Sequence, residues 1–343
     1  MEASSTWMFR EAAEAPAAAR AQLVANDHAV RSLARRLRAS PPRAVVTVAR
    51  GSSDNAATVA RYLIETRLEI LTASAAPSVS SVYAARPAMA DTLCLVISQS
   101  GRSPDIIAAA RSAAAGGALV VAMVNDETSP LAAAAHLVTP LHAGLERSVA
   151  ATKSFIGALT AIVHLLAHWA EDASLLGALE GLPDLLEDAW RLDWTGGLEP
   201  LKSARHLYVM GRGPGLGIAQ EAALKFKETC GLHAEAFSAA EVRHGPMALV
   251  GPGFPVLAFA QDDETRGSVE AAAAALSQRG GDVIQAGGAA APGVRVLPVL
   301  ASHPVLAPIA QIQSFYRMIN TLALARGFDP DHPPHLAKVT ETL

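Results

Sequence analysis

The chain has 343 residues, of which 51% are hydrophobic and 17% charged, and its formal net charge is -4. This length and composition are typical of a globular protein with about two domains. The acidic balance argues against a nucleic-acid-binding surface, and two cysteines, Cys94 and Cys230, are too few for a disulfide framework or a zinc cluster. No segment has the pattern of a signal peptide or a membrane span, so we expect a cytoplasmic protein without nucleic-acid or membrane partners.

Two hydroxyl-bearing turns follow apolar strands in the first half of the chain. The first turn, Gly51–Asp54, comes after a strand predicted at Val45–Val48. The second, Ser98–Ser103, comes after the apolar run Leu93–Ile97, which is typical of a parallel strand covered on both faces, and it leads to Pro104 at a helix start. Parallel strands deliver their carboxyl ends to one sheet edge, so we expect both turns at that edge.

These turns have the composition of an anion site. Hydroxyls, a glycine that allows close backbone approach and the unpaired N–H groups of a helix start can hold a phosphate without a metal. Serine is also a preferred helix cap, so the second turn alone fits a phosphate site and a simple cap equally well; two such turns favour phosphate. The candidate residues are Gly51, Ser52, Ser53, Ser98, Gln99, Ser100 and Ser103.

An internal repeat relates the two halves of the chain. Arg43–Gly51 is echoed by Arg205–Gly213, and each segment leads to a turn, an Ala-rich helix and a second apolar strand, expected in the second half at Val256–Ala260. The repeat predicts an α/β protein with two domains of one fold, each a doubly wound parallel sheet flanked by helices. Ala260, Asp262 and Thr265 replace Ser98, Ser100 and Ser103 in the second half, so only the first half is expected to bind phosphate.

The predicted domain order has five parts. They are a helical lead-in at 1–40, a first domain at 41–175, a helical linker at 176–204, a second domain at 205–328 and a tail at 329–343. Within the linker we expect a helix at Leu182–Leu192 and a loop at Thr195–Leu198. The second domain opens with the Gly-rich turn Gly211–Gly217, but Leu216 stands where a dinucleotide-binding turn needs its third glycine, which excludes nicotinamide.

A group of ionisable residues follows that turn. Glu221, Lys225 and Glu228 are spaced i, i+4, i+7 and share one helix face, a pattern typical by itself of a surface ion-pair ladder. The next segment holds His233 and His244, and histidine can accept and donate protons near neutral pH. A carboxylate base, a lysine and a histidine near a phosphate site can open a sugar ring and move a proton between neighbouring carbons.

At these residues the chain resembles the sugar isomerase (SIS) family, and specifically tandem SIS proteins related to the isomerase half of glucosamine-6-phosphate synthase. The resemblance covers nearly the whole chain, through motifs in the family's order at Met8–Pro16, Ser98–Ser103, Ser148–Ser154, Glu241–Pro246 and Leu336–Lys338. It implies a phosphosugar substrate whose phosphate is held by Ser53, Ser98, Gln99, Ser100 and Ser103, with further contacts from Val149 and Ala337.

The resemblance also implies catalytic roles. Glu228 would shuttle a proton between C1 and C2. Apart from the resemblance, we expect Lys225 either to tune the charge of Glu228 or to pair with Glu221. His244 would open the pyranose ring and, in the family, reaches the site from the second subunit of a homodimer. Lys338 would close over the open-chain sugar. No metal or other cofactor is implied.

The differences between this chain and the synthase pattern determine which activity we expect. Met1–Ser4 leads almost at once into the sugar domain, without the synthase's amidotransferase domain, so we expect that glutamine is not the nitrogen donor. The segments G-R-G-S-S-D, S-G-R-S-P-D, V-N-D-E-T-S-P and V-T-E-T-L resemble SIS-type glucosamine-6-phosphate deaminases. The expected reaction converts glucosamine 6-phosphate and water to fructose 6-phosphate and ammonia. Arg102 replaces an acidic residue of the synthase and either favours anion binding or faces solvent.

Two other classes of function remain open at this stage. Another SIS phosphosugar enzyme, such as a fructosamine-phosphate deglycase or an aldose–ketose isomerase, would share the phosphate site and the base. A non-catalytic sugar-phosphate sensor would use the same phosphate site behind a helix-turn-helix module. Only 40 residues precede the first predicted domain, the charge is acidic, and Glu228 and His244 would have no purpose in a sensor.

Overall fold

A computed structural model of the chain describes residues 2–338; Met1 and the predicted motif at residues 339–343 lie outside the described residues. The chain divides into two compact units, named here by their strands, and each is assembled from separate stretches of sequence. The β6–β10 unit comprises Glu2–Pro16, Arg147–Thr152 and Gly181–Leu336. The β1–β5 unit comprises Ala17–Glu146, Lys153–Glu180 and, at the end of the described residues, Ala337 and Lys338.

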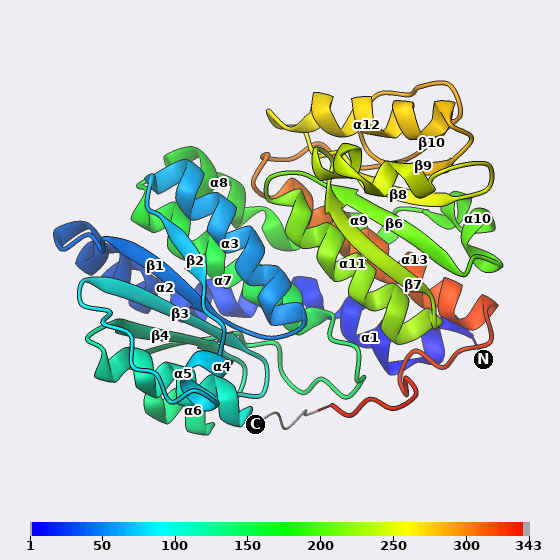
Figure 1. Cartoon of the computed structure of the whole chain (residues 1–343). Helices are drawn as coiled ribbons and strands as arrows, with labels where there is room; N and C mark the ends of the chain where they lie inside the picture. Colours follow the sequence, from blue (N-terminus) through cyan, green and yellow to red (C-terminus); the bar gives the residue numbers. More distant parts are fainter. Residues whose placement is uncertain (1, 339–343) are drawn as a thin grey trace. The chain divides into compact units, whose positions relative to one another are not determined.

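The β1–β5 unit has a parallel five-stranded sheet in the order β2-β1-β3-β4-β5. Its strands are β1 (Ala44–Val48), β2 (Thr72–Ser74), β3 (Thr92–Ser98), β4 (Leu119–Val124) and β5 (Leu137–Pro140). Its helices are α2 (Ala15–Ala39), α3 (Ser52–Leu68), α4 (Ser78–Ser81), α5 (Pro104–Ala115), α6 (Pro130–Ala134), α7 (Lys153–Trp169) and α8 (Ala173–Glu180). Within this unit, α3 and α7 cover one face of the sheet and α5 and α6 the other (Figure 1).

The strand order of this sheet reverses between β1 and β3. These two strands pair in parallel, with Val48 opposite Val96, so their carboxyl ends lie side by side. Their onward connections run to opposite faces of the sheet, and such a switch point is the usual ligand position in doubly wound sheets. The two hydroxyl-bearing turns follow β1 and β3, so they lie at one sheet edge as expected.

The β6–β10 unit repeats this topology. Its parallel sheet has the order β10-β9-β8-β6-β7, in which β6 and β8 take the places of β1 and β3. Its strands are β6 (His206–Gly211), β7 (His233–Ser238), β8 (Pro255–Phe259), β9 (Asp282–Ala286) and β10 (Val294–Leu297). Its α-helices are α1 (Trp7–Ala13), α9 (Leu182–Arg191), α10 (Glu199–Lys202), α11 (Gly215–Cys230), α12 (Arg266–Gln278) and α13 (Ala307–Ala325). Short 3-10 turns are η1 (Ala3–Ser5), η2 (Thr195–Gly197), η3 (Glu241–His244) and η4 (Pro246–Leu249).

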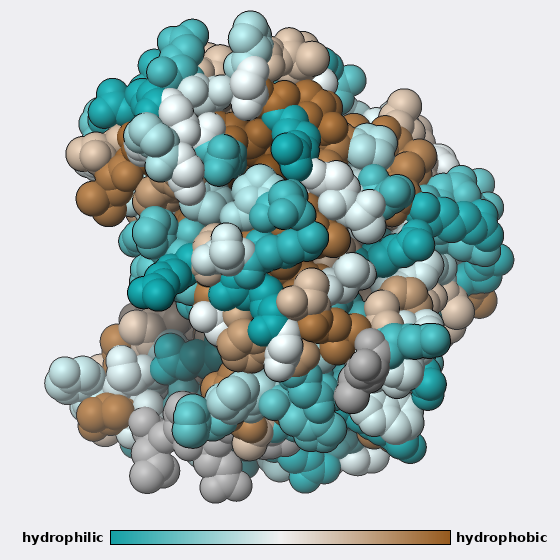
Figure 2. Space-filling model, turned by 90° about the vertical axis from the view of Figure 1, so that its right-hand side faces the viewer, coloured by the Kyte–Doolittle hydropathy of each residue, from teal (hydrophilic) through white to brown (hydrophobic). Residues whose placement is uncertain are grey.

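The predicted fold class, a tandem pair of doubly wound α/β sheets, is confirmed, with local differences. Strand β8 begins one residue earlier than predicted, at Pro255, because a proline without an N–H is tolerated at the first residue of a strand. The expected loop at Thr195–Leu198 contains the turn η2. Among the described residues no helix is both long and apolar enough to cross a membrane, and hydrophilic and hydrophobic residues are interspersed on the face shown in Figure 2.

Candidate functional site

The turn after β3 is held by its own hydroxyls. The Oγ of Ser98 accepts the N–H of Gly101 at 3.0 Å, and the Oγ of Ser100 accepts the N–H of Arg102 at 3.3 Å. Each hydroxyl can therefore still donate its own hydrogen to an anion. Ser103 occupies the N-cap of α5, but its side chain makes no capping hydrogen bond, which weakens the simple helix-cap alternative.

Gly101 is required by the shape of this turn. Its φ of +63° is unfavourable for residues with a side chain, and a Cβ there would lie 2.2 Å from the Oγ of Ser129. Gln99 and Ser103 are half-buried beside it, while Ser98 is buried. The hydroxyls of this turn and the side-chain amide of Gln99 are therefore held on a backbone conformation that requires glycine at position 101.

The first helical turn of α5 holds a carboxylate that the sequence analysis missed. Asp105 is buried, its Oδ1 accepts the N–H of Ile106 at 2.8 Å, and its Oδ2 accepts two hydrogen bonds from the Arg50 guanidinium at 3.0 and 2.9 Å. Arg50 lies just after β1, so this ion pair links the two turns of the switch point. Its guanidinium also offsets the negative charge that Asp105 brings close to the candidate phosphate site.

The turn after β1 places two more hydroxyls at the same edge. Gly51, with φ of +55°, is the N-cap of α3, and Ser52 and Ser53 are its first two helical residues, both half-buried. Arg102 is exposed and its guanidinium pairs with Asp126 at 2.8 Å, so the solvent-facing alternative holds for this arginine. The hydrogen bonds from Thr128 and Arg102 lower the pKa of Asp126.

The corresponding turn of the β6–β10 unit is already occupied by its own carboxylates. Asp263 accepts the backbone N–H of Thr265 at 2.8 Å through Oδ1 and the side-chain amide of Gln261 at 2.8 Å through Oδ2. Asp262 pairs with Arg266 at 2.9 Å. A phosphate at this turn would meet these carboxylates; that only the first half binds one stays a prediction.

The three ionisable residues of α11 come together inside the β6–β10 unit. Lys225 is fully buried, its Nζ lies 3.4 Å from the Oε1 of Glu221, and it donates a hydrogen bond to Glu228. Glu221 is also fully buried and accepts a hydrogen bond from the Tyr316 hydroxyl at 3.1 Å, whereas Glu228 keeps 17% of its side chain exposed. The surface-ladder alternative is therefore wrong, because packing against α13 buries this helix face.

Charge pairing decides the protonation of this lysine. Burial alone would lower the pKa of Lys225, but the carboxylates of Glu221 and Glu228 outweigh it, so the net pKa lies above its usual value. Lys225 is thus a cation that fixes the direction of the Glu228 carboxylate, whose remaining exposure leaves it accessible to a substrate.

The histidines of the predicted catalytic stretch are separated by a strand. His233 begins β7 and His244 ends η3; both side chains are exposed. The sequence pattern did not predict β7, whose side chains are half-buried or exposed along most of its length.

Val149 lies in a short segment that the rest of its unit holds in place. Its N–H donates to the carbonyl of Asp331 at 3.4 Å. The buried Glu11 carboxylate accepts the N–H groups of Arg147 and Ser148, and Asp331 accepts the N–H groups of Trp7 and Met8 at the start of α1. Sequence reasoning did not find Glu11 or Asp331, although Glu11 lies within the family motif at residues 8–16.

Lys338 is paired within the β1–β5 unit. Its Nζ lies 2.8 Å from the Oε2 of Glu146, a buried carboxylate that also accepts the N–H and hydroxyl of Ser154. Ala337 next to it is exposed. Glu146 was also missed, because nothing in its local sequence marks it as the partner of a residue 192 positions away.

Neither cysteine offers thiolate chemistry. Cys94 and Cys230 are both free and buried, and burial raises the pKa of each to about 12. Both therefore remain neutral thiols near pH 7.

Comparisons with known proteins agree with this architecture. The family model described as the SIS domain matches residues 40–168 and 200–285. Glutamine–fructose-6-phosphate aminotransferase (isomerizing) from Aeropyrum pernix is 35% identical over 319 residues, covering 86% of this chain and 50% of the relative. The chain thus spans about half the length of the curated relatives it matches.

Two solved structures share the fold. A protein from Silicibacter pomeroyi DSS-3, provisionally named a phosphosugar isomerase, is 45% identical to this chain and has a TM-score of 0.91. The match covers 95% of this chain and 100% of the Silicibacter chain. Glucosamine-6-phosphate deaminase from Thermotoga maritima is 21% identical, covers 95% and 100% of the two chains, and has a TM-score of 0.73. The second likeness shows the fold alone.

Proposed function

Because this chain belongs to the SIS domain family, we propose that it is a phosphosugar enzyme acting at C1 and C2, and specifically a glucosamine-6-phosphate deaminase of the isomerising type. The observation that carries the proposal is the Lys225–Glu228 pair, in which a partly exposed carboxylate is held by a fully buried ammonium group. A protein without such a base would only bind the phosphosugar. This pair therefore favours an enzyme over a sensor.

The substrate phosphate is assigned to the switch point of the β1–β5 unit. Ser98, Ser100 and Ser103 donate their hydroxyls, Ser53 adds another from α3, and the helix N-termini contribute partial positive charge. This electrostatic anchoring orients the sugar, so that a base of ordinary strength becomes effective.

The chemistry then needs one proton transfer and one hydrolysis. Glu228 removes the C2 proton of the opened amino aldose and a proton is returned to C1, which gives a ketose imine. Water adds to the imine carbon at C2, the C–N bond breaks, and fructose 6-phosphate and ammonia leave. In this proposal His244 opens the ring from the second subunit of a homodimer, and Lys338 acts once the sugar is open, after leaving Glu146.

The direct test is an assay with the purified, metal-free protein and glucosamine 6-phosphate, without glutamine. We expect ammonia and fructose 6-phosphate to appear in equal amounts. Absence of both products, while sugar phosphates still raise the melting temperature, would reject the deaminase and leave a sugar-phosphate-binding protein.

A second candidate is aldose–ketose isomerisation without ammonia release. The name of the Silicibacter relative, which this chain matches over that relative's full length, favours it. Interconversion of a hexose 6-phosphate pair, with no ammonia from the amino sugar, would establish this activity. A fructosamine-phosphate deglycase would instead release an amine from C1.

Replacing the loop hydroxyls tests the phosphate site. The double variant of Ser100→Ala and Ser103→Ala is expected to raise KM at least about tenfold with little change in kcat, because hydrogen bonds to a charged group contribute roughly 1.5–3 kcal/mol each. Ser112→Ala, farther along α5, is the matched control. Steady-state kinetics measures the effect, and an unchanged KM would place the phosphate elsewhere.

A further inference from the structure

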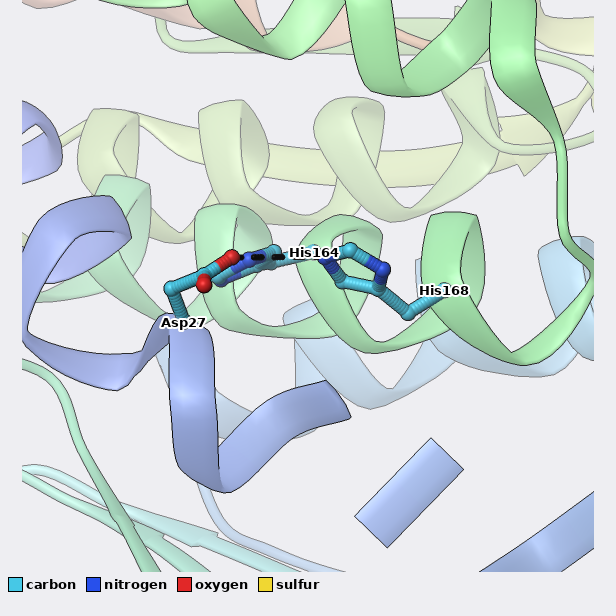
Figure 3. A group of neighbouring side chains, drawn as sticks. All are labelled: Asp27, His164 and His168. Carbon is cyan, nitrogen blue, oxygen red and sulfur yellow. Dashed lines mark ion pairs between the residues drawn. The ribbon is translucent and has the colours of Figure 1, made fainter. Parts of the chain in front are cut away.

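A cluster outside the proposed reaction combines two histidines and a carboxylate. His164 and His168 lie one turn apart on α7, and Asp27 faces them from α2 (Figure 3). One potential ligand atom from each residue lies within 4.8 Å of the other two. The His168 Nε2 is 3.7 Å from the Asp27 Oδ1, and the imidazole ring centres are 5.2 Å apart. All three residues belong to the β1–β5 unit.

His164 provides an independent sign that a partner belongs here. Its side chain is 4% exposed, and its Nδ1 is buried without a hydrogen-bond partner. A buried polar atom with no partner costs free energy and calls for an explanation such as a bound ion. Burial, and secondly the neighbouring His168, lower the pKa of His164 to about 4, so its ring is neutral near pH 7 and its lone pair is available.

We propose that Asp27, His164 and His168 form a binding site for a divalent transition metal of the Zn²⁺ class. Two imidazoles and one carboxylate are a frequent ligand set for Zn²⁺, with water in the fourth position. Ligand bonds of about 2.0–2.2 Å place donor atoms roughly 3.3 Å apart, so side-chain rotations that bring donor atoms closer by up to about 1.5 Å complete the site. Asp27 is 45% exposed, which leaves room for water and a path for the metal.

The surrounding contacts hold the two helices in register. On α2, the buried Gln22 side chain donates to the Gly157 carbonyl of α7 at 2.9 Å, and Arg38 donates to the His168 carbonyl. These bonds lie on either side of Asp27 along α2, so the two helices that carry the three ligands are held together before a metal arrives. A bound ion would join α2 to α7 and stabilise this unit. Its three ligands are not among the residues assigned to the reaction.

Two arginines next to the cluster carry positive charge and therefore oppose the binding of a cation. The Arg31 Nε donates to the Asp27 Oδ1 at 2.8 Å, and Arg38 also carries positive charge near His168. The Arg31 side chain is 60% exposed, so solvent screens its charge, and the Oδ1 of Asp27, which lies 3.7 Å from the His168 Nε2, can exchange this hydrogen bond for a metal bond. Removing this competitor should therefore strengthen binding.

The test uses the tag-free, full-length protein after chelator treatment, titrated with Zn²⁺ by calorimetry and with Co²⁺ by visible absorption. We expect one ion per chain, a Co²⁺ spectrum of a four-coordinate site and a higher melting temperature with Zn²⁺. His168→Gln and Asp27→Asn should each weaken binding at least tenfold and abolish the thermal shift, whereas Arg31→Gln should tighten binding.

His28→Gln is the matched control, since His28 is an exposed neighbour of Asp27 on α2 and not a member of the cluster. Both ligand variants change partly exposed side chains, and their melting temperatures without metal establish that they fold. The proposal is overturned if neither ion binds in a 1:1 ratio, or if binding is equally tight in His168→Gln and Asp27→Asn.

Discussion

The Glu228→Gln variant is expected to lose turnover by a factor of about 10²–10⁴, the usual contribution of a general acid–base catalyst, while KM changes little. Glutamine keeps the size and shape of the side chain but cannot take up a proton. The variant should fold, because the Lys225 ammonium still lies 3.4 Å from the Glu221 carboxylate and so remains paired. Ammonia release from glucosamine 6-phosphate measures the effect.

A second readout separates the proton transfer from imine hydrolysis. In deuterated water the wild-type enzyme should incorporate solvent deuterium at C1 of the product, and the variant should not. Lys227→Gln, at an exposed position on the same helix, is the control and should behave as wild type. If Glu228→Gln retains turnover within a few fold of wild type, another group is the base.

The Lys225→Met variant is expected to lower the free energy of unfolding by about 3–5 kcal/mol, the usual cost of breaking a buried ion pair by removing one partner. Methionine fills a similar volume but takes away the ammonium group between two carboxylates. The fully buried Glu221 then loses that neutralising charge, even though Tyr316 still donates a hydrogen bond to it. Urea unfolding followed by circular dichroism measures the loss.

Combining the substitution with Glu221→Gln tests the electrostatic cause. The double variant should recover most of the stability, because it removes the uncompensated charge, whereas Glu228 keeps solvent contact in either case. Lys227→Met on the exposed face controls for the loss of a lysine from α11. A Lys225→Met protein with the unfolding midpoint of wild type would show that the pair contributes nothing to stability.

Local sequence patterns predicted the parts of the structure that depend on neighbouring residues. The apolar run at Leu93–Ile97 became β3, Pro104 became the first residue of α5, and the helix predicted from Leu182 became α9. The repeat of Arg43–Gly51 at Arg205–Gly213 predicted two domains of one fold, and the two sheets have the same strand order. Both serine turns could be placed at one edge, because parallel strands end on the same side of their sheet.

Those local patterns could not predict contacts between residues that are far apart in the sequence. Glu11 holds the backbone of Arg147 and Ser148, and Glu146 holds Lys338, through contacts between residues more than 130 positions apart. Glu11 and Glu146 looked like ordinary charged residues in the sequence. Their burial depends on which segments pack together, and each unit is assembled from discontinuous stretches of the chain.

The sequence by itself predicted the doubly wound α/β fold class and the two hydroxyl-bearing turns, because strand runs, turn glycines and helix starts are local physical signals. The family was recognised from the resemblance of several motifs in order. Only the tertiary structure decided that the Lys225 face of α11 is buried, and that Asp27 meets His164 and His168. The i, i+4 spacing states which side chains share a helix face. Whether that face meets water or another helix depends on packing, which also decides whether its charges form a weak surface ladder or a strongly coupled buried pair.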